Sequence, residues 1–190
     1  AIKNDLYSYC ISKIYDVTSK KLEEENLLDL FNNIEMPLVQ VLGEMQFNGM
    51  PIDKDELVAF GNKLKEQIES LKQEIYKSVG EEFNINSTQQ LGKILFEKLK
   101  LPVYKKTKTG YSTDSDILEK LLQEHPVIEK LLEYRSLVKL NSTYVEGLIP
   151  YINPKTQRIH SYFHQTITAT GRISSTEPNL QNIPTRFEQG

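Results

Sequence analysis

Apolar residues recur at helical spacing through the first quarter of the chain. Residues 5–32 carry an amphipathic pattern with an acidic second half, and residues 34–47 repeat apolar side chains every three or four positions. These patterns predict two helices, the second one short. Gly49 and Pro51 follow, and both residue types disfavour a continuing helix.

The next segment carries the longest apolar stripe of the sequence. Asp53 is the expected N-cap of a helix, and Glu56, three residues later, has the position that completes a capping box. Apolar residues then recur at steps of three or four, at Leu57, Phe60, Leu64, Ile68, Leu71 and Ile75. A helix reaching Val79 would be roughly 40 Å long, and Gly80 is its expected end.

A second stripe predicts a partner for this helix. Apolar residues again recur near the helical period over residues 127–148. Because an apolar stripe must be buried, we expect the two long helices to pack antiparallel. Their connection, residues 80–125, would then lie at one end of the pair. It would hold two small helices, with Ser87 and Thr113 as their N-caps.

The pattern changes after residue 150. A turn at Asn153-Pro154 is followed by alternating β-branched and aromatic residues, which predict short strands over about 157–164 and 166–171. Two strands are marginally stable alone, so we expect them to begin a larger sheet. The predicted fold class is mainly α: a long antiparallel helix pair with a small helical tip, followed by a short antiparallel β segment.

The net charge of −3 conceals a basic segment. Residues 98–113 hold five lysines and no carboxylate, so the rest of the chain is acidic. A single cysteine, Cys10, excludes an internal disulfide and fits a reducing compartment. No apolar run approaches the roughly 20 residues of a membrane span. All four arginines fall late in the chain, at Arg135, Arg158, Arg172 and Arg186.

Candidate catalytic and metal-binding residues all have simpler explanations. Two carboxylate pairs lie at predicted helix starts, where capping and the helix dipole account for them: Asp53 with Asp55, and Asp114 with Asp116. His160 and His164 share one face of a predicted strand, but no further ligand lies nearby, so a strand pair is favoured over a metal site. No phosphate loop or nucleophile motif occurs. We therefore expect no catalytic residue and no metal in this chain.

Two features of the connection indicate nucleic acid. Its lysines, including Lys105, Lys106 and Lys108, would neutralise phosphates, and engagement of all five would give a log–log salt slope of about −4.5. A solvated loop without a ligand is the alternative. The flanking helix starts offer amides and hydroxyls to phosphate oxygens, although plain capping would use the same groups. These residues are Asn86, Ser87, Ser112 and Thr113.

The last polar stretch, TATGRISSTEPNLQNIP (168–184), resembles the segment that enters the palm of family A DNA polymerases, the bacterial DNA polymerase I group. Three earlier segments resemble, in the correct order, the start of the polymerase domain (34–53), the thumb tip (83–121) and the thumb's return helix with the first palm strand (131–160). The resemblance implies that residues 1–33 end a 3′–5′ exonuclease-like domain, residues 34–150 form the thumb, and residues 151–190 begin the palm.

The resemblance also implies roles for single residues. Arg172 matches an arginine at the minor-groove edge of the primer terminus, where purine N3 and pyrimidine O2 are acceptors in every correct pair. Arg135 and Lys139 match thumb residues that face the minor groove, although Arg135 could instead cover the apolar stripe with its stem. Arg186 matches an arginine on the side of the incoming nucleotide. Polar contacts near the duplex are implied for Asn179, Gln181 and Asn182.

In the family, the metal-binding aspartates lie beyond a segment like TRFEQG, with which this sequence ends. We therefore expect a DNA-gripping piece, inactive alone, of a Mg²⁺-dependent DNA-directed DNA polymerase for replication and repair. Its partners would be primer–template DNA and, for the parent, deoxynucleotide triphosphates. The family's exonuclease motif Tyr-x-x-x-Asp aligns best with Tyr9–Lys13, and Lys13 at the aspartate position predicts a degenerate proofreading site.

Two rival functions remain at this point. A helical protein-interaction module without a nucleic-acid role is the main alternative, and a nuclease-type fragment is weakened by the missing carboxylates. The resemblance further implies a monomer of the bacterial cytoplasm that makes no membrane contact.

Overall fold

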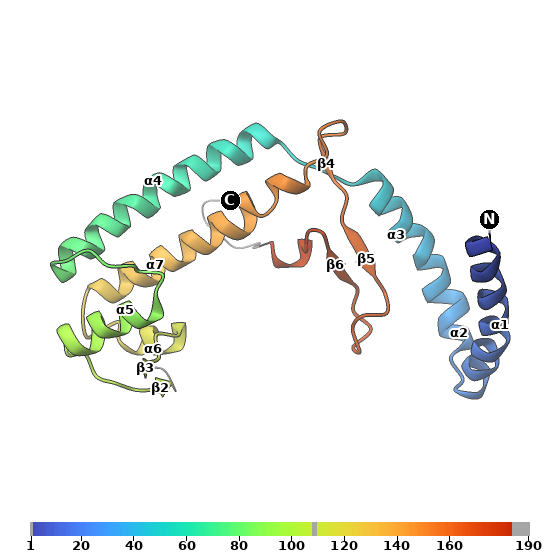
Figure 1. Cartoon of the computed structure of the whole chain (residues 1–190), viewed down its shortest axis with the longest axis horizontal. Helices are drawn as coiled ribbons and strands as arrows, with labels where there is room; N and C mark the ends of the chain where they lie inside the picture. The colour runs from blue at the N-terminus through green and yellow to red at the C-terminus, as the bar shows by residue number, and fades with distance from the viewer. Residues whose placement is uncertain (1, 108–109, 184–190) are drawn as a thin grey trace. The chain divides into compact units, whose positions relative to one another are not determined.

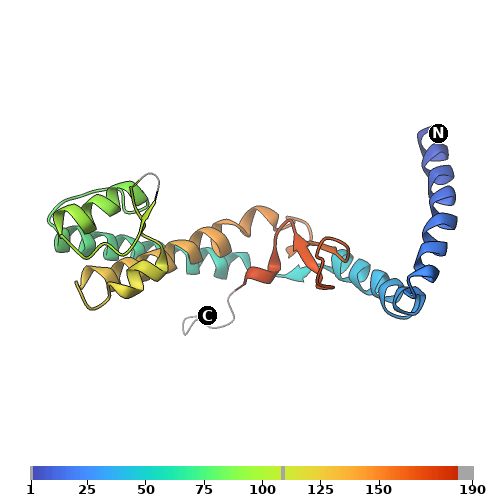
Figure 2. The ribbon, with the colours of Figure 1, turned by 90° about the horizontal axis from the view of Figure 1, so that it is seen from below.

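Two long helices dominate one of the two compact units of the chain, the unit formed by residues 52–157. They are α4 (Lys54–Val79) and α7 (Val127–Leu140), and they run side by side in both views of the ribbon (Figures 1 and 2). The computed structural model describes residues 2–107 and 110–183. The second unit combines the first 51 residues with the segment from Arg158 onward.

Local sequence signals fix both ends of α4. The carboxylate of Asp53 accepts hydrogen bonds from the backbone N–H groups of Asp55 and Glu56, each at 3.0 Å. Gly80 ends the helix with φ 79°, in the left-handed region that glycine adopts without strain. The predicted start and end of this helix are therefore confirmed.

The return helix is longer than α7 alone. It continues without a break as a π-helix, η3 (Asn141–Glu146), and is followed by the short 3-10 helix η4 (Ile149–Tyr151). Two apolar clusters bury the facing sides of the pair. The larger lies toward the connection and has at its centre Ile75, Leu91, Leu95, Leu118, Leu121, Val127, Ile128 and Leu131. The smaller contains Leu64, Leu140 and Val145. The predicted helix pair is confirmed.

Gly61 lies where α4 packs tightly against Val145 of η3. A Cβ atom added there would lie 2.6 Å from Cγ1 of Val145, which no relaxed contact allows. We expect Gly61→Ala to lower the free energy of unfolding by about 1–3 kcal/mol, because the added methyl overpacks the contact. Equilibrium urea unfolding of the chain, followed by circular dichroism, measures this effect.

Gly43 supplies the matched control for that prediction. It is also helical, but an added Cβ would meet nothing within 4 Å. Gly43→Ala should therefore be neutral or stabilising, by about 0.5–1 kcal/mol, through the better helix propensity of alanine. If Gly61→Ala were as well tolerated as Gly43→Ala, the two helices would have to separate more easily than their packing indicates.

The connection between the long helices forms a compact tip at one end of the pair (Figure 2). Its elements are α5 (Thr88–Lys93), the π-helix η2 (Ile94–Lys98), β2 (Lys106–Thr107), β3 (Gly110–Tyr111) and α6 (Ser115–Lys120). The two strands pair antiparallel, with Lys106 opposite Tyr111. Ser87 caps α5 as predicted, through the N–H of Gln90 at 3.3 Å. The predicted cap at Thr113 is wrong, because α6 begins one residue later, after Asp114.

In the other unit, helices precede the first strand. They are α1 (Ile2–Glu24), α2 (Leu28–Leu30), the π-helix η1 (Phe31–Glu35) and α3 (Met36–Asn48). The last three follow one another without interruption. The helix break expected near residue 33 instead falls around Asn26, whose φ of 57° is left-handed. Asparagine tolerates this conformation better than most residues, which explains a break without glycine or proline.

The strands of this unit form two antiparallel pairs. β1 (Met50–Pro51) pairs with β4 (Arg158–Ile159), and β5 (Tyr162–His164) pairs with β6 (Ser174–Thr176), followed by the 3-10 helix η5 (Leu180–Asn182). The strand expected over 166–171 is wrong, because these residues belong to the connection between β5 and β6.

The described architecture confirms the predicted class, a mainly α fold with short antiparallel strands. No helix in the part of the chain that the structure describes combines the length and the apolar character of a membrane span.

Candidate nucleic-acid interface

A polar depression of about 820 Å³ lies at the tip. Two segments that are far apart in the sequence line it: the start of α5 and the turn that follows β3. These are the two segments that the sequence singled out for phosphate oxygens. The lining residues are Asn86, Ser87, Thr88, Gln89, Lys93, Glu97, Gly110, Tyr111, Ser112, Thr113 and Asp114.

The loop before α5 is held by its own side chains. The carbonyl oxygen of the Asn84 side chain accepts from the N–H of Asn86 at 3.0 Å, and Oε1 of Gln90 accepts from the N–H of Asn84 at 2.8 Å. The hydroxyl of Ser87 is occupied as the cap of α5. Asn86 is exposed, so its side-chain amide faces solvent at the rim of the depression.

The second wall of the depression is buried. Ser112 and Thr113 are only 1% and 3% exposed. The Ser112 hydroxyl donates to the carboxylate of Asp114 at 2.7 Å, and both the carbonyl and the hydroxyl of Thr113 accept from the guanidinium of Arg135. The expectation of free hydroxyls at this turn is therefore wrong, because both are used inside the protein. Any contact of these two residues with nucleic acid remains a prediction.

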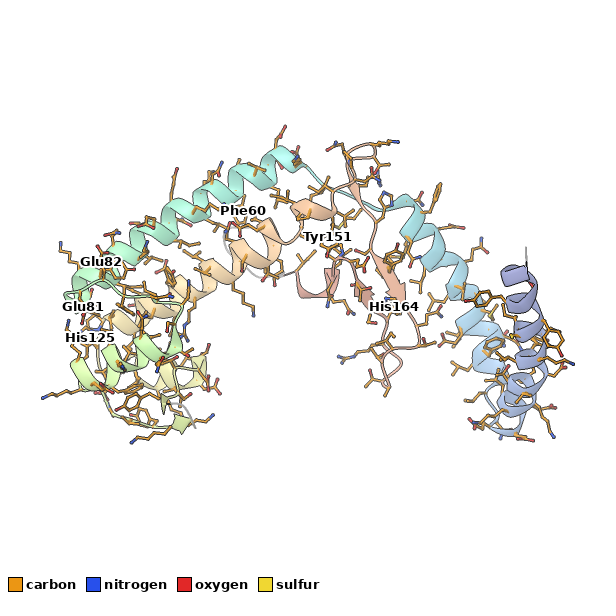
Figure 3. All side chains as sticks on the ribbon, in the orientation of Figure 1. Phe60, Glu81, Glu82, His125, Tyr151 and His164 are labelled. Carbon is orange, nitrogen blue, oxygen red and sulfur yellow. The ribbon has the colours of Figure 1, made fainter. Side chains whose placement is uncertain are left out.

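Carboxylates neutralise part of the basic segment. Nζ of Lys105 lies 3.6 Å from Oδ2 of Asp114, and Nζ of Lys98 lies 2.6 Å from Oε1 of Glu81, which is labelled at the end of α4 in Figure 3. Both pairs are largely exposed, so each contributes little to stability and can exchange its carboxylate for a phosphate. The Ser112 hydroxyl, and then Lys105, hold the pKa of Asp114 below its usual range.

The structure describes Lys106 of this segment but not Lys108. Nζ of Lys106 lies 5.9 Å from the centroid of the Tyr111 ring, within reach of a cation–π interaction. Lys108 lies outside the described residues. The tip therefore offers cations next to an aromatic ring and a polar depression.

Arg135 and Lys139 lie one turn apart on α7 but in different surroundings. Arg135 is half-buried, with Nη2 3.1 Å from the hydroxyl of Thr113, and burial lowers its pKa. Lys139 is exposed and forms no ion pair with any described residue. The structure thus separates two cations that the sequence placed on one surface.

In the other unit, Arg172 lies on the connection between β5 and β6. Gly171, with φ 72°, precedes it, and the hydroxyl of Thr168 donates to the carbonyl of Arg172. The Arg172 side chain is exposed, and its guanidinium makes no hydrogen bond or ion pair with the described residues. The Thr168 hydroxyl therefore holds the backbone of Arg172, while the planar guanidinium of Arg172 has no partner among the described residues.

Amide side chains stabilise the same connection. Nε2 of Gln181 donates to the carbonyl of Ile173 at 2.6 Å. Oδ1 of Asn179 accepts from the N–H of Gln181 at 2.9 Å, and Ser175 lies beside it. The side chain of Asn182 and all of Arg186 lie outside the described residues. Asn179 and Gln181 therefore form one hydrogen-bonded group with the Arg172 loop.

The two histidines of this unit have local partners. Nδ1 of His160 lies 2.9 Å from the carbonyl of Gln46, and Nε2 of His164 lies 2.8 Å from the hydroxyl of Thr176. Within the described residues, no group of three or more histidine, cysteine or carboxylate side chains is close enough to hold a metal ion. The described surfaces therefore suit binding through cations and amides.

Sequence reasoning missed two residues of the tip depression and one residue that supports β5. Gln89 and Lys93 line the tip depression, and both follow the predicted cap at Ser87 within two helical turns, which was an available signal. Gln46 was missed because its role is non-local: its Oε1 accepts from the N–H of Phe163 at 2.7 Å. No local sequence pattern predicts such a contact.

The described surfaces are a paired-helix arm with a polar tip and a hairpin connection that presents an arginine near amide side chains. Residues 54–190 match the family model of DNA polymerase family A. DNA polymerase I of Bacillus subtilis (strain 168) is 48% identical over 180 residues, which cover 95% of this chain and 20% of that protein. DNA polymerase I of Geobacillus stearothermophilus is 50% identical over 171 residues, 90% of this chain and 19% of that protein.

A solved structure agrees with these relatives. The POL domain of Pol1 from M. smegmatis, in complex with DNA primer-template and dNTP, superposes with a TM-score of 0.82 at 40% identity. The match covers 91% of this chain and 30% of that one. The chain belongs to DNA polymerase family A, and it spans about a fifth of the length of the curated relatives it matches.

Proposed function

We propose that this chain is the thumb and the beginning of the palm of a DNA-directed DNA polymerase, where it grips the primer–template duplex. The observation that carries the proposal is the tip depression, because it brings both predicted phosphate-binding segments together beside the lysines. Residues 34–150 would be the thumb, residues 151–190 the start of the palm, and residues 1–33 the end of an exonuclease-like domain. A helical interaction module has no need of this cationic, polar apex.

At the tip, contacts would be made mainly to the DNA backbone. Lys105 and Lys106 would exchange their present partners for phosphates, and Lys108 would act beside them. Asn86 and the first amides of α5 would add hydrogen bonds, as helix starts do for phosphate oxygens. Ser112 and Thr113 would contribute through the shape of the wall. Lys139 would reach the duplex from α7.

At the palm, contacts would be made to base edges. The unpaired guanidinium of Arg172 would probe the minor groove at the primer terminus, where all correct pairs present similar acceptors. Asn179, Gln181 and Asn182 would place amide groups near the duplex. Arg186 would lie on the side of the incoming nucleotide.

The whole polymerase would supply what this part does not. We propose that it uses Mg²⁺ and deoxynucleotide triphosphates, and acts as a monomer in replication and repair in the bacterial cytoplasm. Its proofreading site would be degenerate, because Lys13 takes the place of a metal-binding aspartate. In α1, Nζ of Lys13 lies 5.7 Å from the ring centroid of Tyr9. Metal-dependent 3′–5′ digestion by the full-length polymerase would contradict this last point.

Salt dependence tests the proposed grip. We expect the full polymerase to bind primer–template less tightly as salt rises, and the joint variant Lys105→Ala and Lys106→Ala to have a log–log slope shallower by about 1.8, since each phosphate contact contributes about 0.9. Fluorescence anisotropy at several salt concentrations measures the slope.

The joint variant Lys20→Ala and Lys21→Ala is the matched control, because these exposed lysines of α1 pair with Glu24 and Glu25 on their own helix. It should keep the slope of the natural protein. If both variants lost the same amount of slope, or if neither lost any, the tip lysines would not engage phosphates.

A further inference from the structure

Arg135 connects the return helix to the wall of the tip depression. Its Nη1 donates to the carbonyl of Thr113 and its Nη2 donates to the hydroxyl of the same residue, at 3.1 Å for the second contact. Both ends of the guanidinium fork are thus used on one residue that is only 3% exposed. Burial lowers the pKa of Arg135 and the nearby carboxylate of Asp114 opposes this effect. Two of the five N–H donors of the guanidinium are thus committed to Thr113.

The contact continues from Thr113 into the basic segment. The Ser112 hydroxyl donates to Asp114 at 2.7 Å, and the N–H of Ser112 donates to the carbonyl of Lys105 at 3.1 Å. Asp114 in turn lies 3.6 Å from Nζ of Lys105. The turn that Arg135 fixes is therefore also the base of the β2–β3 hairpin, which carries the lysines.

Lys139 lies on the same helix as Arg135, but its surroundings differ. It lies one turn after Arg135, is exposed, and has no ion-pair partner among the described residues. The two cations consequently have different environments, one turned into the protein and one into solvent. Similar spacing on a helix does not make their functions similar.

We propose that Arg135 is a positioning residue: it holds the turn of residues 112–114 and thereby orients the tip lysines. The proposal rests on the proposed function, because it names how the tip becomes competent to bind. It adds a positioning role to the contact that the family resemblance implied for Arg135, and it leaves the role of Lys139 in place.

The test is a pair of double-mutant cycles in the full polymerase, read as the dissociation constant for primer–template. Arg135→Ala should raise the constant about tenfold, since the buried acceptors of Thr113 lose their donor. Arg135→Lys should be nearly as weak, because an ammonium keeps the charge but cannot reach both acceptors in the same geometry. The maximal rate at saturating DNA should stay unchanged, because the chemistry does not involve the tip.

Thr113→Val removes the hydroxyl and keeps the shape of the side chain. Combined with Arg135→Ala, it should add little, because both changes break the same link. Combined with Lys139→Ala, it should add in full, because these residues act independently. Additive effects for Arg135 and Thr113, or an Arg135→Lys variant with natural affinity, would overturn the proposal.

Hydrogen exchange without DNA gives a second readout. Arg135→Ala should speed amide exchange at residues 110–115 at least severalfold, whereas Lys139→Ala should leave it unchanged. Unchanged exchange in Arg135→Ala would overturn the positioning role even if DNA binding fell. If the natural polymerase showed no salt-dependent binding at all, the proposed function would fail, while the exchange result would still report on the link between Arg135 and Thr113.

Discussion

Arg172→Ala in the full polymerase is expected to weaken transition-state binding at the primer terminus by about 1–3 kcal/mol, the worth of a good base-edge contact. The guanidinium is exposed and unpaired among the described residues, so its removal breaks no internal hydrogen bond. The loss should therefore appear in primer extension and not in stability. Single-turnover extension of matched and mismatched primers measures it, and discrimination against mismatches should fall.

Arg172→Lys separates geometry from charge. A lysine keeps the positive charge but lacks the planar fork, so this variant should retain the salt dependence of binding and still lose mismatch discrimination. Lys155→Ala is the control, since it removes an exposed cation from the turn at Asn153, and it should extend primers normally. Natural discrimination in Arg172→Ala would remove the basis for assigning this residue to the primer end.

Local signals in the sequence predicted the helix pair well. Asp53 and Gly80 act through atoms within a few residues of themselves, so a cap and a left-handed end can be inferred without knowing the tertiary structure. The apolar stripes of α4 and α7 are long enough that both helices must bury one face, and short-range connection through the tip favours packing against each other. The resemblance to family A polymerases then placed the arm within a larger enzyme, which periodicity alone could not do.

The two misplaced elements have different physical causes. Thr113 was taken for a helix cap because its sequence context fits one, but its carbonyl and hydroxyl are bound by Arg135, 22 residues away. Residues 166–171 have strand composition, yet Gly171 and the Thr168 hydroxyl shape them into a connection. A non-local hydrogen bond outweighs local propensity at Thr113, and a single sequence does not reveal it. At residues 166–171 the contacts are local, but strand composition outweighed the turn signal of Gly171 in the prediction.

The candidate site shows the same division. The lysines and the two polar helix starts were evident from composition and capping patterns. Their convergence on one depression was not, because it depends on how the β2–β3 hairpin packs against α5 and its continuation η2. Contacts between Phe96 and Tyr111, with ring centroids 4.9 Å apart, bring the hairpin against this helix. Spatial convergence of distant segments is what the structure adds to the sequence.

Leu131→Ala should be the most destabilising of the substitutions considered, with a loss of about 2–5 kcal/mol in the free energy of unfolding. Leu131 is 0% exposed and lies in the larger apolar cluster, where α7 packs against α4 and the tip. Truncation removes buried surface and leaves a cavity that rigid neighbouring helices fill only in part. Equilibrium urea unfolding of the chain measures the loss.

Leu122→Ala is the matched control, because it deletes the same atoms from a side chain that is 40% exposed just after α6. Its effect should stay within about 0.5 kcal/mol, as for most surface changes. Since the lysines of the tip act only when the arm holds them together, Leu131→Ala should also weaken binding of the polymerase to primer–template, and Leu122→Ala should not. Equal stability of the two variants would mean that the helix pair does not depend on its buried apolar residues. The inference that these residues hold the tip in place for DNA binding would then be wrong.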